Sequence, residues 1–599
     1  MTTPGLRPVA SRAHFGFWIL DFGLTSKSKI QNRKSKIGHR RLRSIATRFI
    51  PLLLALFSLP LHAGSTVIAS KAALSTASPY ATKVGLDVLR RGGNAIDAAV
   101  AVSFALAAVH PQAGNIGGGG FLVYYDAATK GFWTLDYRET APGAATRDMY
   151  VEVPAGSRTG PRAGGVPGTV AGLAAAHERF GTQPWKDLLT PAIAAARAGI
   201  VVDAELESEL AAQRDDRKID QFPSTAAIFF PDGKPAARGS TIVQSDLAAT
   251  LERIAEGGAD DFYRGETAKR LVDGVRAGGG ILGDRDLREY RAIWRAPLKI
   301  RFRDFEIYTM APPSGGGLAM AEALNILAGF DLRSAGFQTA KAIHVYAEAW
   351  RRAYIDRNRY IGDPASTRIP LADLLSAARA EMWRKSIDVD RATPTVSLGA
   401  PEVTLRERSE TTHFTIVDDR GNIASLTTTI NGTFGSGFVV PGTGFFLNNE
   451  MDDFASAPGR PNAAGLVQDA PNAIEPGKRM ASSMTPTIIF RDSRPFLAIG
   501  TRGGPTIPTT ILQVFLHMVV HGKTLADAVA APRYHHQGLP ERIDVERGRP
   551  PETLLEALNA MGHGTHPRGP IGDVHAIAFE EGRLIAVADP RRGGSAGGY

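Results

Sequence analysis

Apolar residues recur at intervals of three and four positions through most of residues 81–387, which is the spacing of one face of an α-helix. This pattern predicts helices over residues 81–89, 95–109, 170–179, 185–198, 246–256, 267–277, 317–327, 339–354 and 371–387. Alternating or short apolar runs predict strands at 120–125, 131–137 and 305–310. Residues 95–109 are apolar nearly all round with Asp97 inside, so a buried helix capped by Gly93 or Asn94 is expected.

The pattern changes after residue 387. Residues 388–410 are rich in proline, serine and charge and have no apolar period, which predicts an exposed, mobile segment. Strands are then predicted at residues 413–417, 423–430, 444–447, 485–490 and 495–500. Two helices are predicted after them, at residues 509–521 and 551–561. Because helices precede and follow the strands, we predict a layered α+β fold whose sheet core draws on both halves of the chain.

Residues 1–63 have the composition of a leader. They contain 11 Lys and Arg residues and a single acid, Asp21, so they carry +10 and leave −1 of the formal net charge of +9 to the remainder. A near-neutral body offers no field for nucleic acid. The apolar run 49–57 is too short to span a bilayer and precedes a small-residue site after Ala63. We expect an exported, periplasmic or secreted protein without a stable membrane span; an uncleaved anchor is the alternative, and the true start is expected downstream of Met1.

Several kinds of chemistry are excluded or weakly supported. The chain has no cysteine, which excludes disulfides, thiolate metal sites and thiol nucleophiles. The glycine run at 115–120 follows a helix, so it favours a tight turn near a binding site over a dinucleotide loop. His535 and His536 lack the spacing of metal ligands. The acidic run 450–453 could hold a metal or a substrate ammonium, or form a solvated turn.

The segment that begins at Thr411 carries the clearest candidate nucleophile. A hydroxyl needs a base, and a residue at a chain's N-terminus can use its own α-amine. A three-residue turn at 419–421, with Gly421 in the left-handed region, would place Thr429 opposite Thr411 to within one or two residues. The plain alternative is a threonine-rich hairpin without catalytic function.

These residues belong to a series of motifs that resembles the gamma-glutamyltransferases. The series runs in order over residues 66–599 and includes GGNAIDAA at 92–99, HPQAGNIGGGG at 110–120, DYRETAP at 136–142, GVPGTV at 165–170, PPSGGG at 312–317, TTHF at 411–414, TTTIN at 427–431, LNNEMDDF at 447–454, PGKRMASSMTP at 476–486 and GTRGG at 500–504. The resemblance implies a four-layer αββα sandwich of the N-terminal-nucleophile hydrolase type. It also implies a precursor that cuts itself between Glu410 and Thr411 into chains 64–410 and 411–599, which together form one composite domain.

The resemblance implies a role for each site residue. Thr411 attacks the γ-carbonyl of a γ-glutamyl amide such as glutathione, Thr429 hydrogen-bonds this nucleophile, and the backbone amides of Gly503 and Gly504 form the oxyanion hole. The α-carboxylate and the α-ammonium of the donor are held by two sets of residues, Arg138, Ser482 and Ser483 for the first and Asn431, Glu450 and Asp453 for the second. Opposite charges are expected at the two ends of the pocket. Water, an amino acid or a peptide then accepts the glutamyl group, and no cofactor or metal is implied.

Two alternative functions stay open, and the sequence departs from the family pattern at two positions. A β-lactam side-chain acylase of the same fold is the first alternative, although residues 455–475 are long enough for the covering loop of the glutathione-cleaving members. A non-processing glutamyl-binding protein is the second. Glu450 stands where some members carry glutamine, which would strengthen the hold on the ammonium. Arg502 occupies a position often filled by a small residue or proline, and this points to an altered acceptor side.

Overall fold

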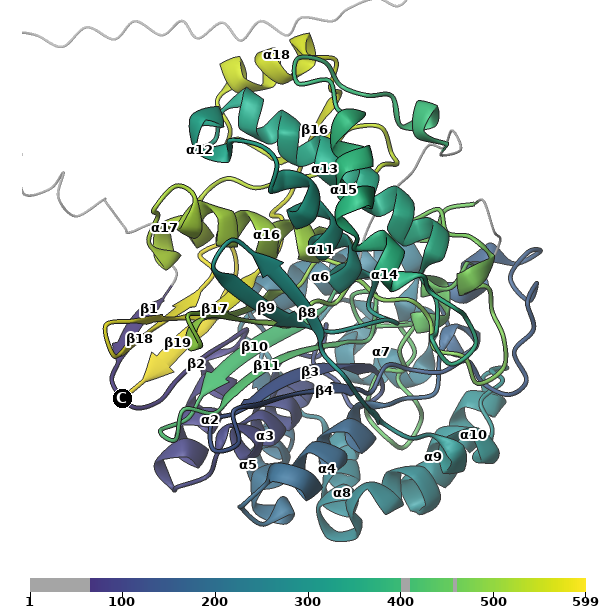
Figure 1. Cartoon of the computed structure of the whole chain (residues 1–599). Helices are drawn as coiled ribbons and strands as arrows, with labels where there is room; N and C mark the ends of the chain where they lie inside the picture. Colours follow the sequence, from purple (N-terminus) through teal and green to yellow (C-terminus); the bar gives the residue numbers. More distant parts are fainter. Residues whose placement is uncertain (1–64, 400–409, 456–459) are drawn as a thin grey trace, which may run out of the picture. The chain divides into compact units, whose positions relative to one another are not determined.

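The computed structural model describes residues 65–399, 410–455 and 460–599. Two seven-stranded sheets lie face to face between two outer layers of helices (Figure 1). Neighbouring strands in both sheets are antiparallel. In spatial order, the β10 sheet contains β19 (Ser595–Gly598), β2 (Ala73–Thr76), β10 (Thr412–Val417), β11 (Ile423–Thr429), β3 (Gly119–Asp126), β4 (Gly131–Asp136) and β7 (Ile293–Arg295). The β13 sheet contains β1 (Thr66–Ala69), β18 (Arg583–Ala588), β17 (Val574–Glu580), β13 (Arg494–Thr501), β12 (Thr487–Arg491), β9 (Phe305–Thr309) and β8 (Leu298–Phe302).

Each outer layer of helices packs against one sheet. The layer on the β10 sheet shares an apolar core with Phe414 and Leu426, and contains α2 (Pro79–Arg90), α3 (Ala95–Val109), α4 (Thr169–Phe180), α5 (Trp185–Ala198), α8 (Ser245–Arg264), α9 (Glu266–Ala277) and α10 (Asp284–Glu289). The layer on the β13 sheet shares a core with Leu497 and Ile499, and contains α11 (Gly315–Leu327), α12 (Leu332–Ala335), α13 (Ala340–Tyr360), α15 (Ala377–Lys385), α16 (Thr506–Val519), α17 (Leu525–Ala530) and α18 (Glu552–Ala560).

A third core fills the space between the sheets. It is built from inward-facing strand residues such as Val123 and Ile423 of the β10 sheet and Ile488 and Ile577 of the β13 sheet. Three apolar layers between four structural layers are the αββα arrangement that the resemblance implies, and the predicted fold class is confirmed. Smaller elements complete the fold: α6 (Ala204–Arg217), α7 (Pro223–Phe229), α14 (Leu371–Leu374), β5 (Ile200–Val201), β6 (Thr241–Ile242), β14 (Tyr534–His535), β15 (Ile543–Glu546) and β16 (Thr565–Arg568).

The predicted elements agree with the structure in most places. Helix α3 has the predicted bounds, and the Asn94 side chain caps it by accepting from the amides of Ile96 and Asp97. Two predictions are wrong. The helix expected over 371–387 is broken into α14 and α15, and Ser376 caps the second piece. The strand expected at 444–447 is an irregular loop with one isolated bridge, because Gly442 and Gly444 adopt positive φ.

Part of the segment that we expected to be exposed and mobile is held against the protein. Thr395 is fully buried; its hydroxyl donates to the carbonyl oxygen of Gly538 over 2.9 Å, and its amide donates to Glu541 over 2.6 Å. Composition did not predict these contacts, because it does not show which distant loop the polar residues of a proline-rich stretch will bond to. Residues 400–409 of this segment lie outside the described part, as do 456–459 of the expected covering loop and the whole leader 1–63.

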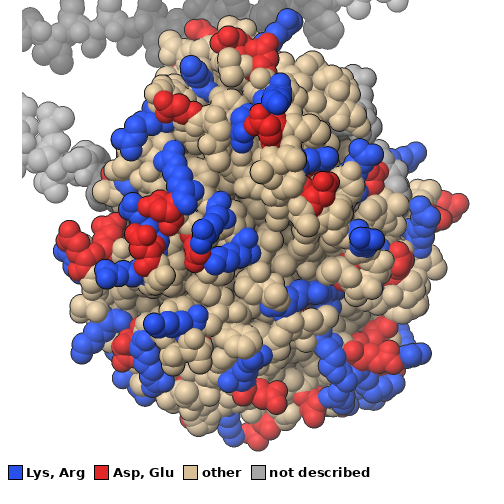
Figure 2. All heavy atoms as spheres, in the orientation of Figure 1, with Lys and Arg blue, Asp and Glu red and all other residues tan. Residues whose placement is uncertain are grey.

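The surface carries both signs of charge. Figure 2 shows Lys and Arg interspersed with Asp and Glu over the face in view, with no extended region of one sign. This agrees with a body of near-zero net charge. None of the helices within the described residues is long and apolar enough to cross a membrane.

Candidate active site

The β10–β11 hairpin brings the two predicted threonines together. Thr412 pairs with Thr428, and Val417 with Ile423, so the register places Thr429 opposite Thr411 as predicted. The turn is the three-residue loop expected, with Gly421 at φ 83°. The register predicted from the turn is therefore confirmed, within the one or two residues that the sequence left open.

The hydroxyl of Thr429 is directed at the peptide bond that precedes Thr411. Its Oγ1 donates to the carbonyl oxygen of Glu410 over 2.9 Å and accepts from the amide of Asn431 over 2.7 Å. The amide of Glu410 in turn donates to the carbonyl oxygen of Asn431 over 2.7 Å. The carbonyl of Glu410 is therefore held by a buried donor.

The glycine turn at 115–120 sits beside this hairpin, as the sequence indicated. A Cβ atom on Gly118 would lie only 2.0 Å from the carbonyl oxygen of Thr429. The amide of Gly118 donates to the Asn115 side chain over 2.9 Å, which fixes the turn. Glycine is needed here because the backbone of the turn touches the end of β11.

The predicted oxyanion glycines lie between β13 and α16. Gly503 and Gly504 have φ values of 123° and 54°, and their carbonyl oxygens accept from the amides of Thr506 and Ile507 in the first turn of α16. Backbone amides at a helix N-terminus lack helical partners and favour negative charge. Gly504 lines the same pocket as Thr411.

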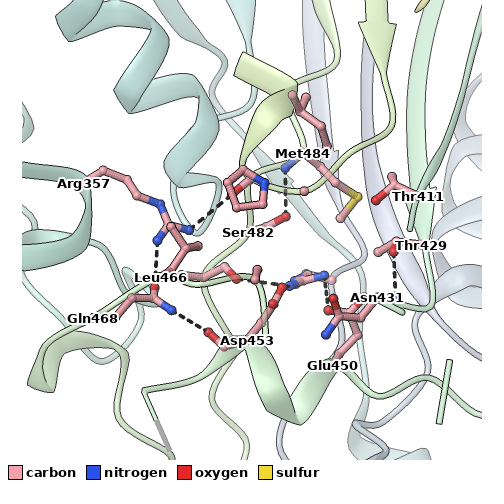
Figure 3. Close-up of a pocket in the computed structure, with 17 residues that line it drawn as sticks. Arg357, Thr411, Thr429, Asn431, Glu450, Asp453, Leu466, Gln468, Ser482 and Met484 are labelled. Atoms are coloured by element: carbon pink, nitrogen blue, oxygen red, sulfur yellow. Dashed lines mark hydrogen bonds and ion pairs between the residues drawn. The ribbon is translucent and has the colours of Figure 1, made fainter. Parts of the chain in front are cut away.

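One small pocket collects most of the predicted site residues. It is lined by Arg138, Arg357, Thr411, Thr429, Asn431, Glu450, Asp453, Ala464, Leu466, Gln468, Ala481, Ser482, Ser483, Met484, Gly504, Pro505 and Ile507. Figure 3 shows the two threonines at one side and Arg357 with Gln468 at the other. Its volume is about 20 Å³, which is room for one water molecule.

Charges of both signs meet directly in this pocket. Nη1 of Arg138 lies 2.6 Å from Glu450 and 3.6 Å from Glu139, and Nη2 contacts Asp453. The expectation that opposite charges occupy opposite ends is wrong, because isolated buried charges are costly and these groups pair instead. Burial raises the pKa of Glu450 well above its usual value and that of Glu139 to about 8, while the Arg138 charge opposes both shifts.

The two serines line the same pocket as Arg138. Ser482 Oγ accepts from the amide of Met484 over 3.1 Å, and Ser483 Oγ accepts from Nη2 of Arg357 over 3.5 Å. The Arg138 side chain reaches the same segment by donating to the carbonyl oxygen of Ala481 over 3.1 Å. The segment that carries the serines is therefore contacted by both arginines of the pocket.

Sequence reasoning missed Arg357 and Gln468. Arg357 on α13 is 1% exposed, and its Nη1 donates to Gln468 Oε1 over 3.0 Å. No carboxylate among the described residues forms an ion pair with it, and burial lowers its pKa to about 10. A signal was present: Arg357 follows Tyr346, Trp350 and Tyr354 at helical spacing, so it falls on the buried face of the helix.

Asn431 occupies a strained backbone position at the end of β11. Its φ is 70°, a region that asparagine tolerates better than most residues. Its side-chain amide donates to the carbonyl oxygen of Asn449 over 3.0 Å, next to Glu450. This contact links the end of the nucleophile hairpin to the acidic segment of the pocket.

Another cluster within the described residues has the spacing of metal ligands. His344, Glu348 and His563 are all buried. Glu348 already pairs with Arg351 and Arg352, at 3.2 and 2.6 Å, and Nδ1 of His344 lies 2.7 Å from Nε2 of His563. The candidate ligand atoms are thus engaged with protein partners, and the cluster is best explained as structural.

Comparisons with known proteins agree on one family. The sequence profile described as "Gamma-glutamyltranspeptidase" matches residues 81–599. The chain is 40% identical over 532 residues to the "Glutathione hydrolase proenzyme" of Escherichia coli strain K12, covering 88% of this chain and 91% of that one. It is 41% identical over 561 residues to the protein of the same name from Pseudomonas sp. strain A14, covering 91% and 97%. The crystal structure of cephalosporin acylase from Bacillus halodurans is similar in fold, with a TM-score of 0.79, 28% identity, and coverage of 89% of this chain and 97% of that one.

Proposed function

The chain belongs to the gamma-glutamyltranspeptidase family, and we propose that it cuts itself between Glu410 and Thr411 and then cleaves γ-glutamyl amides such as glutathione. The observation that carries this proposal is the hydrogen bond from Thr429 to the Glu410 carbonyl, in the hairpin that presents Thr411 to the pocket. The products would be a chain of residues 64–410 and a chain of residues 411–599 that stay together. Strands from both pair within one sheet, since β10 lies beside β2 and β11 beside β3.

Self-cleavage requires a carbonyl that is polarised before the attack. The Oγ of Thr411 would add to the carbonyl carbon of Glu410, and the C–N bond would break as the nitrogen takes a proton. This step exchanges an amide for an ester, which water then hydrolyses to a carboxylate on Glu410 and a free hydroxyl on Thr411. The Thr429 hydroxyl stabilises the developing oxyanion.

The free α-amine of Thr411 then serves as the base in turnover. It takes the proton from the Thr411 hydroxyl as Oγ attacks the γ-carbonyl of the donor. The amides of Gly503 and Gly504 stabilise the oxyanion, and the departing amine receives the proton as the acyl-enzyme forms. Water yields glutamate from this ester, whereas the amine of an amino acid or peptide yields a new γ-glutamyl amide.

The charged cluster explains why the donor must carry an amino-acid head group. In our proposal the α-ammonium binds Asn431, Glu450 and Asp453, and the α-carboxylate binds Arg138, Ser482 and Ser483. A zwitterionic head group can bind among these paired charges, because its ammonium is a partner for the acids and its carboxylate is a partner for the arginine. Arg357 adds a second cation next to Ser483. A plain acyl group would separate the buried ions without replacing their contacts.

The test compares two anilides that differ only in the α-amino group. γ-Glutamyl-p-nitroanilide should be hydrolysed, and the release of nitroaniline should accelerate when glycylglycine is added as an acceptor. Glutaryl-p-nitroanilide, which lacks the ammonium, should be cleaved at least ~10-fold more slowly in kcat/KM, because Glu450 and Asp453 lose their partner. Equal or faster cleavage of the glutaryl compound would favour the side-chain acylase alternative and contradict our proposal.

We also propose that the mature protein acts outside the cytoplasm. The support is the basic and apolar leader in residues 1–63, which ends in a small-residue cleavage site after Ala63. Fractionation of cells that express the full chain should place the γ-glutamyl activity in the exported fraction. Removal of residues 1–63 should return that activity to the cytoplasmic fraction, and an unchanged distribution would contradict export by this leader.

A further inference from the structure

A second cavity lies on the other side of the Glu410–Thr411 bond. Its volume is about 300 Å³, and it is lined by Ser208, Glu209, Ala212, Gln213, Glu410, Thr433, Arg502, Gly503, Thr506, Arg568, Gly569, Pro570, Gly572 and Arg592. Glu410 and Gly503 line this cavity, whereas their neighbours Thr411 and Gly504 line the small pocket described above. The bond to be cut and the glycine pair therefore form the wall between the two.

The buried part of this cavity is formed by the guanidinium of Arg502, which contacts Glu410, the residue before the proposed cut. Arg502 is 4% exposed, and its Nη2 contacts the carboxylate of Glu410. Its Nη1 lies 3.6 Å from Glu205, which also pairs with Arg592. The cavity wall thus carries three guanidiniums, of Arg502, Arg568 and Arg592, and two carboxylates, of Glu209 and Glu410, and Glu410 is the residue that becomes a chain end when the bond is cut.

Cutting changes this balance. When the new chain end at Glu410 moves away from Thr411, Arg502 loses the carboxylate that it contacts directly; Glu205, 3.6 Å away, is shared with Arg592, and Glu209 and Asp573 are its other acidic neighbours. A buried guanidinium that loses its carboxylate is costly to leave unpaired, and a bidentate carboxylate from a ligand is the partner that fits its geometry. Arg138 and Arg357 do not serve this side, because both line the small pocket with Thr411.

We propose that Arg502 binds the carboxylate of the acceptor amino acid or peptide, and that the Glu410 side chain occupies this place until the chain is cut. The inference rests on the proposed function. The acceptor amine must reach the acyl group on Thr411 from the side where the leaving amine departed. The cavity opens on that side next to Gly503, and its volume falls at the lower end of the range of small-molecule sites.

The experiment compares acceptors with and without a carboxylate. Transfer from γ-glutamyl-p-nitroanilide is measured with glycylglycine and with glycylglycinamide, in the wild-type enzyme and in Arg502→Met. The wild type should have a KM about 10- to 100-fold lower for the acid than for the amide, and Arg502→Met should reduce this ratio to near one. Each ratio is taken within one enzyme, so changes in the cut fraction or in donor turnover cancel.

Arg214→Met is the matched control. Arg214 lies on α6 close to the cavity but does not line it, and its removal changes the net charge by the same amount. This variant should keep the wild-type ratio. Arg502→Lys retains the positive charge but has a shorter side chain that lacks the planar guanidinium. This variant should therefore give an intermediate ratio.

Three results would overturn the inference. These are a wild-type enzyme that does not distinguish the acid from the amide, an Arg502→Met variant that keeps the full preference, and a control that loses it equally. If Arg502→Met stays uncut, the wild-type ratio and Arg502→Lys still decide the question. A wild-type enzyme that does not turn over the donor at all would instead refute the proposed function, so the two failures are distinguishable.

Discussion

At the residue scale, the donor recognition that we propose depends on two carboxylates that pair with Arg138. Glu450 and Asp453 contact the same guanidinium, and burial raises the pKa of Glu450. A bound ammonium would give these acids a second positive partner beside the arginine and so stabilise their charged forms. The hairpin residues to which we assign the cut lie on a different element, so we expect mutations to separate substrate binding from self-cleavage.

Asp453→Asn should separate them. The variant keeps the shape of the side chain but removes one charge from the ammonium site, so we expect the KM for γ-glutamyl-p-nitroanilide to rise by about 10- to 100-fold. Cutting should proceed as in the wild type, because Thr429 still holds the Glu410 carbonyl. Asp469→Asn, which changes an exposed acid next in sequence to Gln468 of the small pocket, is the control and should leave KM unchanged. An unaltered KM in Asp453→Asn would show that this carboxylate does not bind the donor.

At the element scale, the start of β3 and the end of β11 must approach closely for the hairpin to present its threonines. Gly118 makes this possible, since any side chain there meets the Thr429 backbone. The pairing of Thr428 with Gly120 continues the contact along the two strands. A small change in this packing would move the Thr429 hydroxyl, and hydrogen bonds weaken steeply with misalignment.

Gly118→Ala should therefore impair self-cleavage. We expect the uncut fraction of the purified protein, measured on denaturing gels over time, to rise at least ~10-fold relative to the wild type. Gly593→Ala is the matched control, because a Cβ at that position meets no atom within 4 Å and its φ lies outside the left-handed region. Normal cutting of the Gly118→Ala protein would mean that the hydroxyl of Thr429 is not positioned by this contact.

Elements fixed by local geometry were predicted best. The β10–β11 register followed from a turn with Gly421, and the α3 bounds followed from Asn94 and a 15-residue apolar run. Strands β1, β2 and β19 were not predicted, because each has only four residues and pairs with a distant partner, as Ala596 does with Ser75. Strands β17 and β18 were also not predicted, although they form a local hairpin in which Glu580 pairs with Arg583. The Arg502–Glu410 contact was also invisible, since a sequence does not show which distant charges become neighbours.

At the scale of the whole molecule, buried histidines link folding to pH. Burial lowers the pKa of His110, His535 and His563 to about 4 and that of His517 to about 3. Between pH 6.5 and 4 such a histidine takes up a proton in the unfolded chain but not in the folded one, so its contribution to stability is lost as pH falls. Buried acids such as Glu139 act in the opposite sense, with stability lost as pH rises, so a single site is tested best by difference.

His535→Asn in the uncut Thr411→Ala background provides that difference. The variant loses bonds to Thr509 and Gln537, so it should be less stable than its parent at pH 7.5. As pH falls from 6.5 to 4, the gap in unfolding free energy should shrink by about 3 kcal/mol, because only the parent has a buried imidazole to protonate. Urea unfolding at several pH values gives the gap. A gap that stays constant would contradict the lowered pKa of His535.

The central claim is that Thr411 is both the cutting residue and the new N-terminus. Intact-mass analysis of the purified chain tests it most directly, together with N-terminal sequencing and the variants Thr411→Ala and Thr411→Ser. We predict two polypeptides in the wild type, the smaller spanning residues 411–599, a single uncut chain in Thr411→Ala, and slower but correct cutting in Thr411→Ser. A wild-type chain that stays whole, a cut at another bond, or a Thr411→Ala protein that is cut as fast as the wild type would contradict the account.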